Sequence, residues 1–317
     1  MPASVIIDTD PGLDDALALF IACASPELDI VGVTTVAGNL ALSRTTANTL
    51  KLLHHLGRDE VPVVAGCAGP LRRKSFEVAD IHGEDGLGGA TLPSPDRQPL
   101  PVHATRWLAD ELLRRRAHSL RILALGPLTN LAHLMESRPD AANRLGGIIA
   151  MGGAIRESGN VTKFAEFNIA TDPEAADIVF GSSVPVTLVP LDVTRRVLAD
   201  REWNAVLLAK GGKIARTANG LIEAYLRNLV ASRAATGDPP QTPAPQFPMH
   251  DPCVVLHAID PSLFRSEHLA LRVLADGSER DGATVIDPGV ENRVEALTQV
   301  DGNRALSLIL ERLTRLP

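Results

Sequence analysis

An unusual concentration of carboxylates follows the first hydrophobic run of the chain, Val-Ile-Ile at 5–7. The next nine residues, 8–16, read Asp-Thr-Asp-Pro-Gly-Leu-Asp-Asp-Ala and place four acids within eight residues: Asp8, Asp10, Asp14 and Asp15. Like charges this close repel one another, so such clusters persist mainly where a cation or a polyhydroxylated ligand compensates them. Because a hard divalent cation such as Ca²⁺ selects carboxylate oxygens, the cluster predicts a cation site beside a polar ligand.

The spacing around the acids indicates a strand, a tight turn and a helix. Pro11 and Gly12 suit a turn, and the apolar positions 13, 16, 17 and 20 recur at helical spacing. Asp14 and Asp15 then lie in the first helical turn, where an acid caps the helix and stabilises its dipole. Capping explains one or two of these acids but leaves Asp10 unexplained, which favours the functional interpretation.

The elements that must position these acids form an alternating pattern. Apolar runs without polar alternation recur between amphipathic segments, at 5–7, 30–36, 61–65, 120–125, 147–151 and 184–191. This pattern predicts an α/β fold, a single domain over 1–317 with a mostly parallel, Rossmann-like open sheet and helices on both faces. Ligands of such sheets bind at the carboxyl ends of the strands, where Asp8 and Asp10 fall. No Gly-x-Gly-x-x-Gly follows the first strand, so a dinucleotide site is not supported.

Composition limits the partners. The net charge is −7 and the basic residues form no long run, so we expect no nucleic-acid partner. The three cysteines lack CxxC spacing, and no signal or membrane-spanning segment is apparent, which predicts a cytoplasmic protein with reduced thiols and no membrane contact. Two long segments, 72–98 and 232–248, have the composition of surface loops. Loops of this length are lids, binding loops or disordered segments, and we expect lids, with plain disorder an equal alternative for the second.

Further polar motifs follow the later strands. They are Thr-Val-Ala-Gly-Asn at 35–39, His-Gly at 82–83, Leu-Gly-Pro-Leu-Thr-Asn at 125–130, Met-Gly-Gly at 151–153, Asn160, Glu-Phe-Asn at 166–168 and His-Asp-Pro at 250–252. Together with the acidic segment at 8–16, this ordered set resembles the nucleoside hydrolases, the inosine-uridine-preferring family that hydrolyses the N-glycosidic bond of ribonucleosides. The resemblance runs from the start of the chain to about Cys253.

The resemblance implies a glycosidase of the EC 3.2.2 class with Ca²⁺ at the bottom of its pocket. By motif position, the ligands would be Asp10, Asp15, the carbonyl of Leu125 and Asp251. Three carboxylates and a carbonyl leave room in the Ca²⁺ shell for a water and for sugar hydroxyls. Asp10 would be the general base that takes the proton of this water.

The same resemblance assigns the substrate contacts. The ribose 2′ and 3′ hydroxyls would be held by Asp14, Asp15, Asn39 and Asn168, and the 5′ hydroxyl by Asn160 and Glu166. Such a site rejects deoxy sugars, because their loss of a hydroxyl leaves its polar groups unpaired. His250 is the catalytic candidate for protonating the leaving base, and His82 is the second candidate near the base. Phe167 and Met151 would form apolar walls, although ordinary core packing explains them nearly as well.

Two other interpretations fit parts of the sequence. Asp-Thr-Asp after a buried strand imitates the start of a haloacid-dehalogenase-like phosphatase, with Asp8 as nucleophile, but the downstream Lys and acidic pair of that family have no clear counterparts. A non-catalytic nucleoside- or sugar-binding protein on the same scaffold is the other. The resemblance implies a homodimer or homotetramer and a role in nucleoside catabolism or salvage. Pyrimidine-preferring members of the family that the chain resembles tend to carry Tyr and Gln on the helix ahead of the His-Asp pair, whereas the only tyrosine here, Tyr225, lies well upstream of a long Pro-rich insertion. Base preference therefore stays open.

Overall fold

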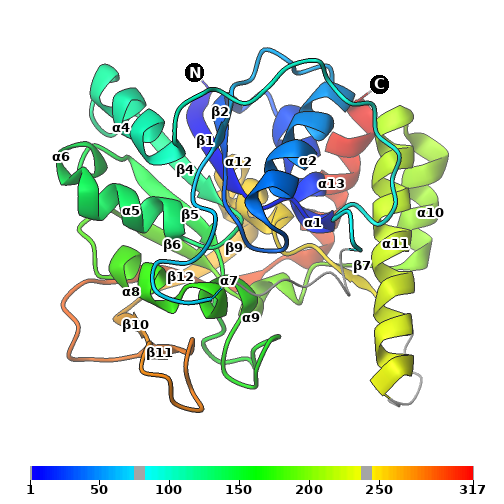
Figure 1. Cartoon of the computed structure of the whole chain (residues 1–317). Helices are drawn as coiled ribbons and strands as arrows, with labels where there is room; N and C mark the ends of the chain where they lie inside the picture. Colours follow the sequence, from blue (N-terminus) through cyan, green and yellow to red (C-terminus); the bar gives the residue numbers. More distant parts are fainter. Residues whose placement is uncertain (1, 75–82, 237–244, 317) are drawn as a thin grey trace.

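An eight-stranded sheet lies at the centre of the computed structural model, which describes residues 2–74, 83–236 and 245–316 (Figure 1). Its strand order is β3-β2-β1-β4-β5-β6-β12-β9. The strands are β1 (Ala3–Thr9), β2 (Leu28–Thr35), β3 (Val63–Ala65), β4 (Leu120–Ala124), β5 (Gly147–Met151), β6 (Val186–Val189), β9 (Phe264–Leu269) and β12 (Val294–Val300). Every neighbouring pair from β3 to β12 is parallel, and β9 is antiparallel to β12. All six predicted strands belong to this sheet, so the mostly parallel α/β prediction is confirmed.

Apolar and polar residues do not alternate along the strands because each face of the sheet packs against a hydrophobic core. In β1, Val5 and Ile7 pack into one core and Ile6 into the other. Successive side chains of a strand point to opposite faces, so a strand covered on both sides needs apolar residues at every position. Helices cover both faces, as predicted (Figure 1).

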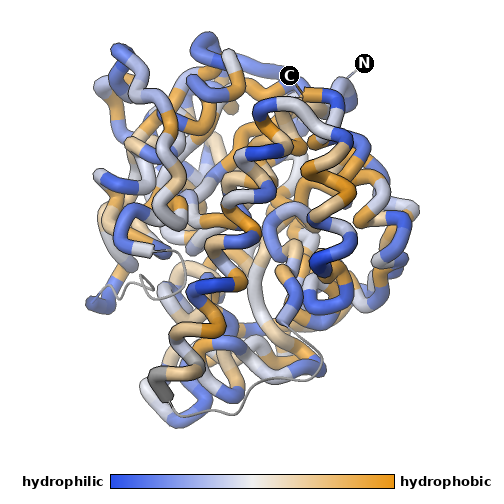
Figure 2. Tube along the Cα trace, turned by 90° about the vertical axis from the view of Figure 1, so that its right-hand side faces the viewer, coloured by the Kyte–Doolittle hydropathy of each residue, from blue (hydrophilic) through white to orange (hydrophobic). Residues whose placement is uncertain are grey.

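The two helix layers are distinct in their packing. The first layer contains α1 (Leu13–Cys23), α2 (Leu42–His55), α10 (Arg201–Lys210), α11 (Lys213–Thr236), α12 (Pro252–Ile259) and α13 (Gly302–Arg315). The second contains α4 (Ala104–Arg114), α5 (Thr129–Ser137), α6 (Pro139–Ala142) and α8 (Pro173–Phe180). Figure 2 shows blue and orange residues alternating along the helices nearest the viewer, the pattern of helices with one apolar face.

Short elements complete the rim at the carboxyl ends of the strands. They are α7 (Phe167–Thr171), α9 (Leu191–Thr194) and the small sheet of β7 (Leu198–Ala199) with β8 (Phe247–Pro248). A second small sheet pairs β10 (Leu271–Val273) with β11 (Thr284–Ile286), and a 3₁₀ turn spans Pro261–Leu263. The sequence analysis found none of these elements, nor β9 and β12, because short and partly exposed strands carry little periodic signal.

The two expected lid loops are only partly described, since 75–82 and 237–244 lie outside the described residues. The described stretch 83–98 has no helix or strand, as expected of a loop. In the second segment the prediction was wrong at its start: 232–236 continue α11, because a stretch rich in Ala and Arg favours helix. No helix among the described residues is long and apolar enough to cross a membrane.

Candidate active site

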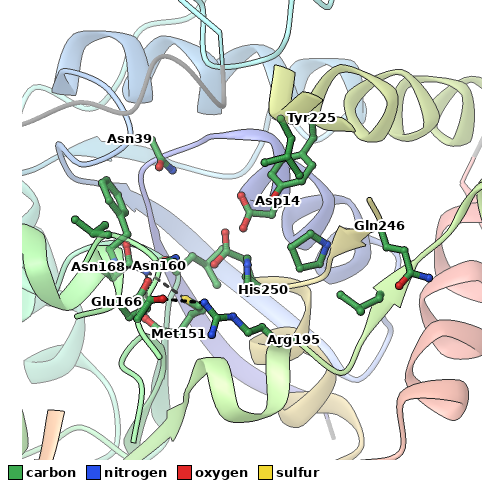
Figure 3. Close-up of a pocket in the computed structure, with 18 of the residues that line it drawn as sticks. Asp14, Asn39, Met151, Asn160, Glu166, Asn168, Arg195, Tyr225, Gln246 and His250 are labelled. Atoms are coloured by element: carbon green, nitrogen blue, oxygen red, sulfur yellow. Dashed lines mark hydrogen bonds between the residues drawn. The ribbon is translucent and has the colours of Figure 1, made fainter. Parts of the chain in front are cut away.

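A pocket of about 740 Å³ opens at the carboxyl ends of the parallel strands (Figure 3). Most of the residues that sequence motifs assigned to a site line it together: Asp14, Asn39, Leu125, Met151, Asn160, Glu166, Phe167, Asn168, His250 and Asp251. They come from the ends of β2, β4 and β5 and from the starts of α1, α7 and α12, except for Asn160, which lies in the loop between β5 and α7. His82 lies outside the described residues. Parallel strands present their carboxyl ends at one edge, which is why segments so distant in sequence meet here.

Asp10 lies behind the pocket wall, in a space that two glycines keep open. Its Oδ2 accepts the backbone N–H of Asn39 at 2.7 Å. A Cβ atom built on Gly38 would fall 2.1 Å from Oδ2, and one on Gly126 would fall 2.2 Å from Oδ1. Asp10 is 1% exposed, and its Oδ1 is buried with no hydrogen-bond partner among the described residues. Leaving a buried carboxylate oxygen without a partner is energetically costly, so Oδ1 is a candidate to bind a ligand or to accept a proton.

Asp15 performs the capping role that its position predicted. Its carboxylate accepts the N–H of Gly12 at 2.9 Å, the hydroxyl of Thr9 at 2.5 Å and the Asn39 amide at 3.3 Å. These bonds satisfy the first turn of α1 and hold the carboxylate in one orientation. Asp15 therefore combines helix capping with a place in the acidic group.

Three carboxylates from two helices converge at the floor of the pocket. Single oxygens of Asp14, Asp15 and Asp251 lie within 4.8 Å of one another. Asp10, which we expected among the metal ligands, is not one of these three residues. Asp14, which we expected to contact the ribose, is one of them. The carbonyl of Leu125 lines the same pocket and accepts the Asn168 amide at 2.7 Å. A set of carboxylates and a carbonyl, in which Asp15 and Asp251 are buried and Asp14 is half-buried, suits a hard divalent cation.

Burial and mutual repulsion disfavour the charged forms of these carboxyls. Burial, followed by the charge of Asp15, raises the pKa of Asp14 to about 7 and the pKa of Asp10 well above its usual range. The pKa of Asp251 is also raised well above its usual range, by burial and then by the charge of Asp14. A bound cation would relieve this repulsion, so the electrostatics agree with the donor set.

Asn168 and Glu166 form a polar arc that continues from the floor of the pocket to its rim. Asn168 donates from Nδ2 to the carbonyls of Leu125 and Met151, at 2.7 and 3.2 Å. Glu166 is buried, and its Oε2 accepts the N–H groups of Gly153 and Ile169 at 3.0 and 3.2 Å. Burial raises the pKa of Glu166 above its usual value. These bonds fix two side chains whose remaining oxygens can meet hydroxyl groups of a ligand.

His250 lies on the opposite side of the acidic floor from this arc (Figure 3). Its Nδ1 lies 2.7 Å from Oγ1 of Thr194, which is fully buried on α9. This hydrogen bond orients the imidazole ring in the pocket wall.

Sequence reasoning missed several lining residues, among them Arg195 and Gln246. Tyr225 also lines the pocket, from α11, with its ring packed edge-on against Phe247 at a centroid distance of 4.8 Å. The uniqueness of Tyr225 was the only signal for it. Nothing in the local sequence distinguishes Arg195 from other arginines.

Asp8 is not among the described lining residues. It is fully buried, and its Oδ1 accepts from Asn130 at 2.8 Å and from the Thr34 hydroxyl. Burial raises the pKa of Asp8 to about 6. A phosphatase nucleophile must face its substrate, so this geometry disfavours the haloacid-dehalogenase interpretation.

Comparisons with known proteins agree with this geometry. The family model described as inosine-uridine preferring nucleoside hydrolase matches residues 5–307. The chain is 38% identical over 317 residues to the pyrimidine-specific ribonucleoside hydrolase RihA of Photobacterium profundum, and the match covers 99% of each protein. Among solved structures, the plant nucleoside hydrolase PpNRh1 superposes with a TM-score of 0.91 at 35% identity, over 99% of both chains.

A purine-preferring ribonucleoside hydrolase from Gardnerella vaginalis superposes with a TM-score of 0.90 at 29% identity, covering 99% of this chain and 98% of its own. Relatives whose names give different base preferences therefore match this chain over nearly its whole length. Ribonucleoside hydrolases act on N-glycosyl bonds. The chain belongs to the inosine-uridine preferring nucleoside hydrolase family and is an enzyme of this class.

Proposed function

We propose that this enzyme hydrolyses ribonucleosides to ribose and free base, with Ca²⁺ as its cofactor and Asp10 as general base. The observation that carries the proposal is the acidic floor, where Asp14, Asp15 and Asp251 converge, together with the buried and unpaired Oδ1 of Asp10. In a metal-free protein, repulsion between these carboxylates lowers the stability of the fold. Beneath a sugar that becomes positively charged in the transition state, the same carboxylates stabilise that charge.

The residues that would hold the cation are Asp10, Asp15, Asp251 and the carbonyl of Leu125. Ca²⁺ accepts six to eight oxygen ligands in flexible geometry, so this set leaves positions for a water and for sugar hydroxyls. When bound, Ca²⁺ lowers the pKa of water in its shell and thereby favours a hydroxide-like nucleophile at neutral pH. Asp14 would contact the ribose, although it lies within the acidic group. Calcium affinity is therefore the measurement that separates a role of Asp14 in binding the ribose from a role in binding the cation.

Asp10 is suited to accept the proton of the attacking water. Asn39 holds one carboxylate oxygen through its N–H, which leaves Oδ1 for the proton. Gly38 and Gly126 leave room for the carboxylate in this position, because a Cβ atom on either residue would collide with it, and the Asn39 N–H holds it there. A base held in one place loses little freedom in the transition state.

The ribose would lie between the floor and the polar arc. Asp14, Asn39 and Asn168 are suited to the 2′ and 3′ hydroxyls, since amides donate and accept while carboxylates accept. Glu166 and Asn160 are suited to the 5′ hydroxyl. The carboxylates around the sugar would stabilise the oxocarbenium-like transition state of glycosidic cleavage.

His250 is suited to protonate the leaving base, because Thr194 holds the ring through Nδ1. Met151 and Phe167 would form walls, and Tyr225 would face the base from α11. The relatives include a pyrimidine-specific and a purine-preferring enzyme, so we propose ribonucleosides as the substrate class without choosing a base. We also propose a homodimer or homotetramer, as in the sequence-based expectation.

The test is ribose release from inosine, uridine, cytidine and adenosine, by protein treated with EDTA and then given Ca²⁺ or Mg²⁺. A phosphatase substrate serves as the control. We expect ribose release that EDTA abolishes and Ca²⁺ restores better than Mg²⁺. Release that is indifferent to EDTA would overturn the calcium proposal. Nucleoside binding without any release would overturn the hydrolytic proposal in favour of a binding protein.

A further inference from the structure

The loop of residues 155–165, between β5 and α7, carries Asn160 to the rim of the pocket (Figure 3). From Arg156 to Lys163 no side chain is buried, so this stretch has no hydrophobic anchor. Holding each backbone residue in one conformation costs about 1–2 kcal/mol of entropy. Polar contacts must therefore order the 155–165 loop.

The polar contacts at the start of the loop and just before Asn160 come from the short helix α9 and the residue after it. Asp192 is 7% exposed, and its two oxygens accept the backbone N–H groups of Ile155 and Arg156 at 2.9 and 2.8 Å. Three residues later, Arg195 donates from Nη1 to the carbonyl of Ser158 at 2.6 Å and from Nη2 to that of Gly159 at 3.0 Å. Hydrogen bonds of this type involve a charged partner and are stronger than neutral ones.

Arg195 thereby holds two successive peptide planes. The carbonyl of Gly159 and the N–H of Asn160 belong to one planar unit, which Arg195 binds at the oxygen and the carbonyl of Ala165 binds at the nitrogen, at 3.2 Å. The preceding plane is held in the same way, because the N–H of Gly159 donates to Lys163 at 3.0 Å. Both planes are fixed at each end.

The side chain of Asn160 is oriented by a separate contact. Its Oδ1 accepts the N–H of Phe167 at 2.9 Å, at the start of α7. The amide nitrogen of Asn160 is then the group that can donate to a ligand in the pocket. With the backbone of Asn160 held through Arg195 and its side chain held through Phe167, the amide has one orientation.

We propose that Arg195, supported by Asp192, is a positioning residue that sets Asn160 for the 5′ hydroxyl of the ribose. This inference rests on the proposed function, in which Asn160 binds that hydroxyl. Arg195 also lines the pocket, whereas Asp192 is not among the described lining residues. An effect shared by both variants therefore acts through the 155–165 loop and not through direct contact with substrate.

The kinetic test compares uridine with 5′-deoxyuridine, or inosine with 5′-deoxyinosine if the enzyme prefers purines. We expect Arg195→Met and Asp192→Asn to lower kcat/KM for the parent nucleoside about 10-fold to 100-fold, the cost of a misplaced contact. For the 5′-deoxy substrate, which lacks the hydroxyl, the loss should fall to about 3-fold or less. Arg195→Lys, which keeps the positive charge and one donor nitrogen in place of two, should recover part of the activity. Equal losses on both substrates, or no loss on either, would overturn the proposal.

Arg156→Met is the matched control. It removes an arginine from the same loop, but the Arg156 side chain pairs with Glu267 on β9 and not with α9. Its backbone N–H, which Asp192 accepts, is retained. Activity on both substrates should stay within about 2-fold of the original protein.

Backbone hydrogen exchange tests the positioning without requiring activity. In Arg195→Met, peptides that cover the 155–165 loop should exchange at least about 10-fold faster, while peptides of β4 and β5 should be unchanged. Unchanged exchange in the loop would overturn the role of Arg195. Failure of the original protein to release ribose would instead overturn the proposed function, and the exchange result would still decide whether Arg195 holds the loop.

Discussion

The acidic floor of the pocket and the 155–165 loop at its rim are built in opposite ways. The floor consists of Asp14 and Asp15 in the first turn of α1 and Asp251 directly before α12, and the helices that carry them pack into a hydrophobic core. No residue of the loop from 156 to 163 is buried, and the side chains of Asp192 and Arg195 hold the loop. Both regions contribute polar groups to one pocket.

The comparison teaches where each region can tolerate change. Carboxylates of the floor are forced close together by packed strands and helices, so repulsion is stored there until a cation compensates it. Rim groups are surrounded by solvent, so their repulsions are screened and their order depends on a few bonds. Changes in the floor should affect chemistry and metal binding, and changes in the rim should affect substrate positioning.

The largest effect should come from Asp10→Asn, which keeps the shape of the side chain but removes the proposed base. We expect kcat to fall about 10³-fold, the typical contribution of general base catalysis. The metal-free variant should unfold at a higher temperature than the original protein, because one member of a repelling group has lost its charge. Activity assays and thermal unfolding in EDTA measure both effects. Full activity of the variant would remove Asp10 as the base.

Gly126→Ala tests whether the floor is as rigid as the comparison implies. The added methyl group would lie 2.2 Å from Oδ1 of Asp10, so the carboxylate must move. We expect a loss of about 10²-fold in kcat. Gly220→Ala on α11 is the control, since a Cβ atom there meets nothing within 4 Å and should only stabilise the helix. Unchanged activity of Gly126→Ala would show that the Asp10 carboxylate can move without loss of catalysis, so that this part of the site is not rigid.

The stabilisation by Ca²⁺ should increase with pH. The folded-state pKa values of Asp10, Asp14 and Asp251 are raised, with that of Asp14 at about 7. In metal-free protein, the stability that these groups contribute is therefore full below their unfolded pKa and is lost as pH rises toward neutrality. Bound Ca²⁺ offsets this loss.

The measurement is the shift in unfolding temperature between Ca²⁺ and EDTA. We expect it to be several degrees larger at about pH 8 than at about pH 5, because protons compete with the cation for the same oxygens. A shift that is independent of pH would show that the raised carboxyls are not the ones that bind the metal.

The smallest effect should come from the ion pair between Arg156 and Glu267 at the outer side of the rim. Their side chains are 52% and 47% exposed. An exposed pair contributes about 0.2–1 kcal/mol, so Arg156→Met should change the free energy of unfolding by less than about 1 kcal/mol. Denaturant unfolding measures it, and a larger loss would mean that the rim is more strongly coupled to the core than its exposure indicates.

Much of the site was predictable because the carboxyl ends of parallel strands lie at one edge of the sheet, whatever the order of the strands. Asn39, Leu125 and Met151 follow or end different strands, and whichever strands are neighbours, their carboxyl ends meet at one edge. The apolar runs predicted the strands for a related reason, since a sheet covered on both faces requires consecutive apolar residues such as Val5, Ile6 and Ile7.

The sequence by itself determined the order of the motifs, the α/β class and the family to which the chain belongs. Tertiary structure alone decided that β9 pairs antiparallel with β12 at the edge of the sheet, and that Tyr225 and Arg195 line the pocket. It also decided that Asp14, and not Asp10, lies within 4.8 Å of Asp15 and Asp251. Local patterns report which face of an element is buried, because burial follows the helical or strand period. They do not report distances between side chains on elements far apart in the sequence, which depend on how the packed layers place one backbone against another.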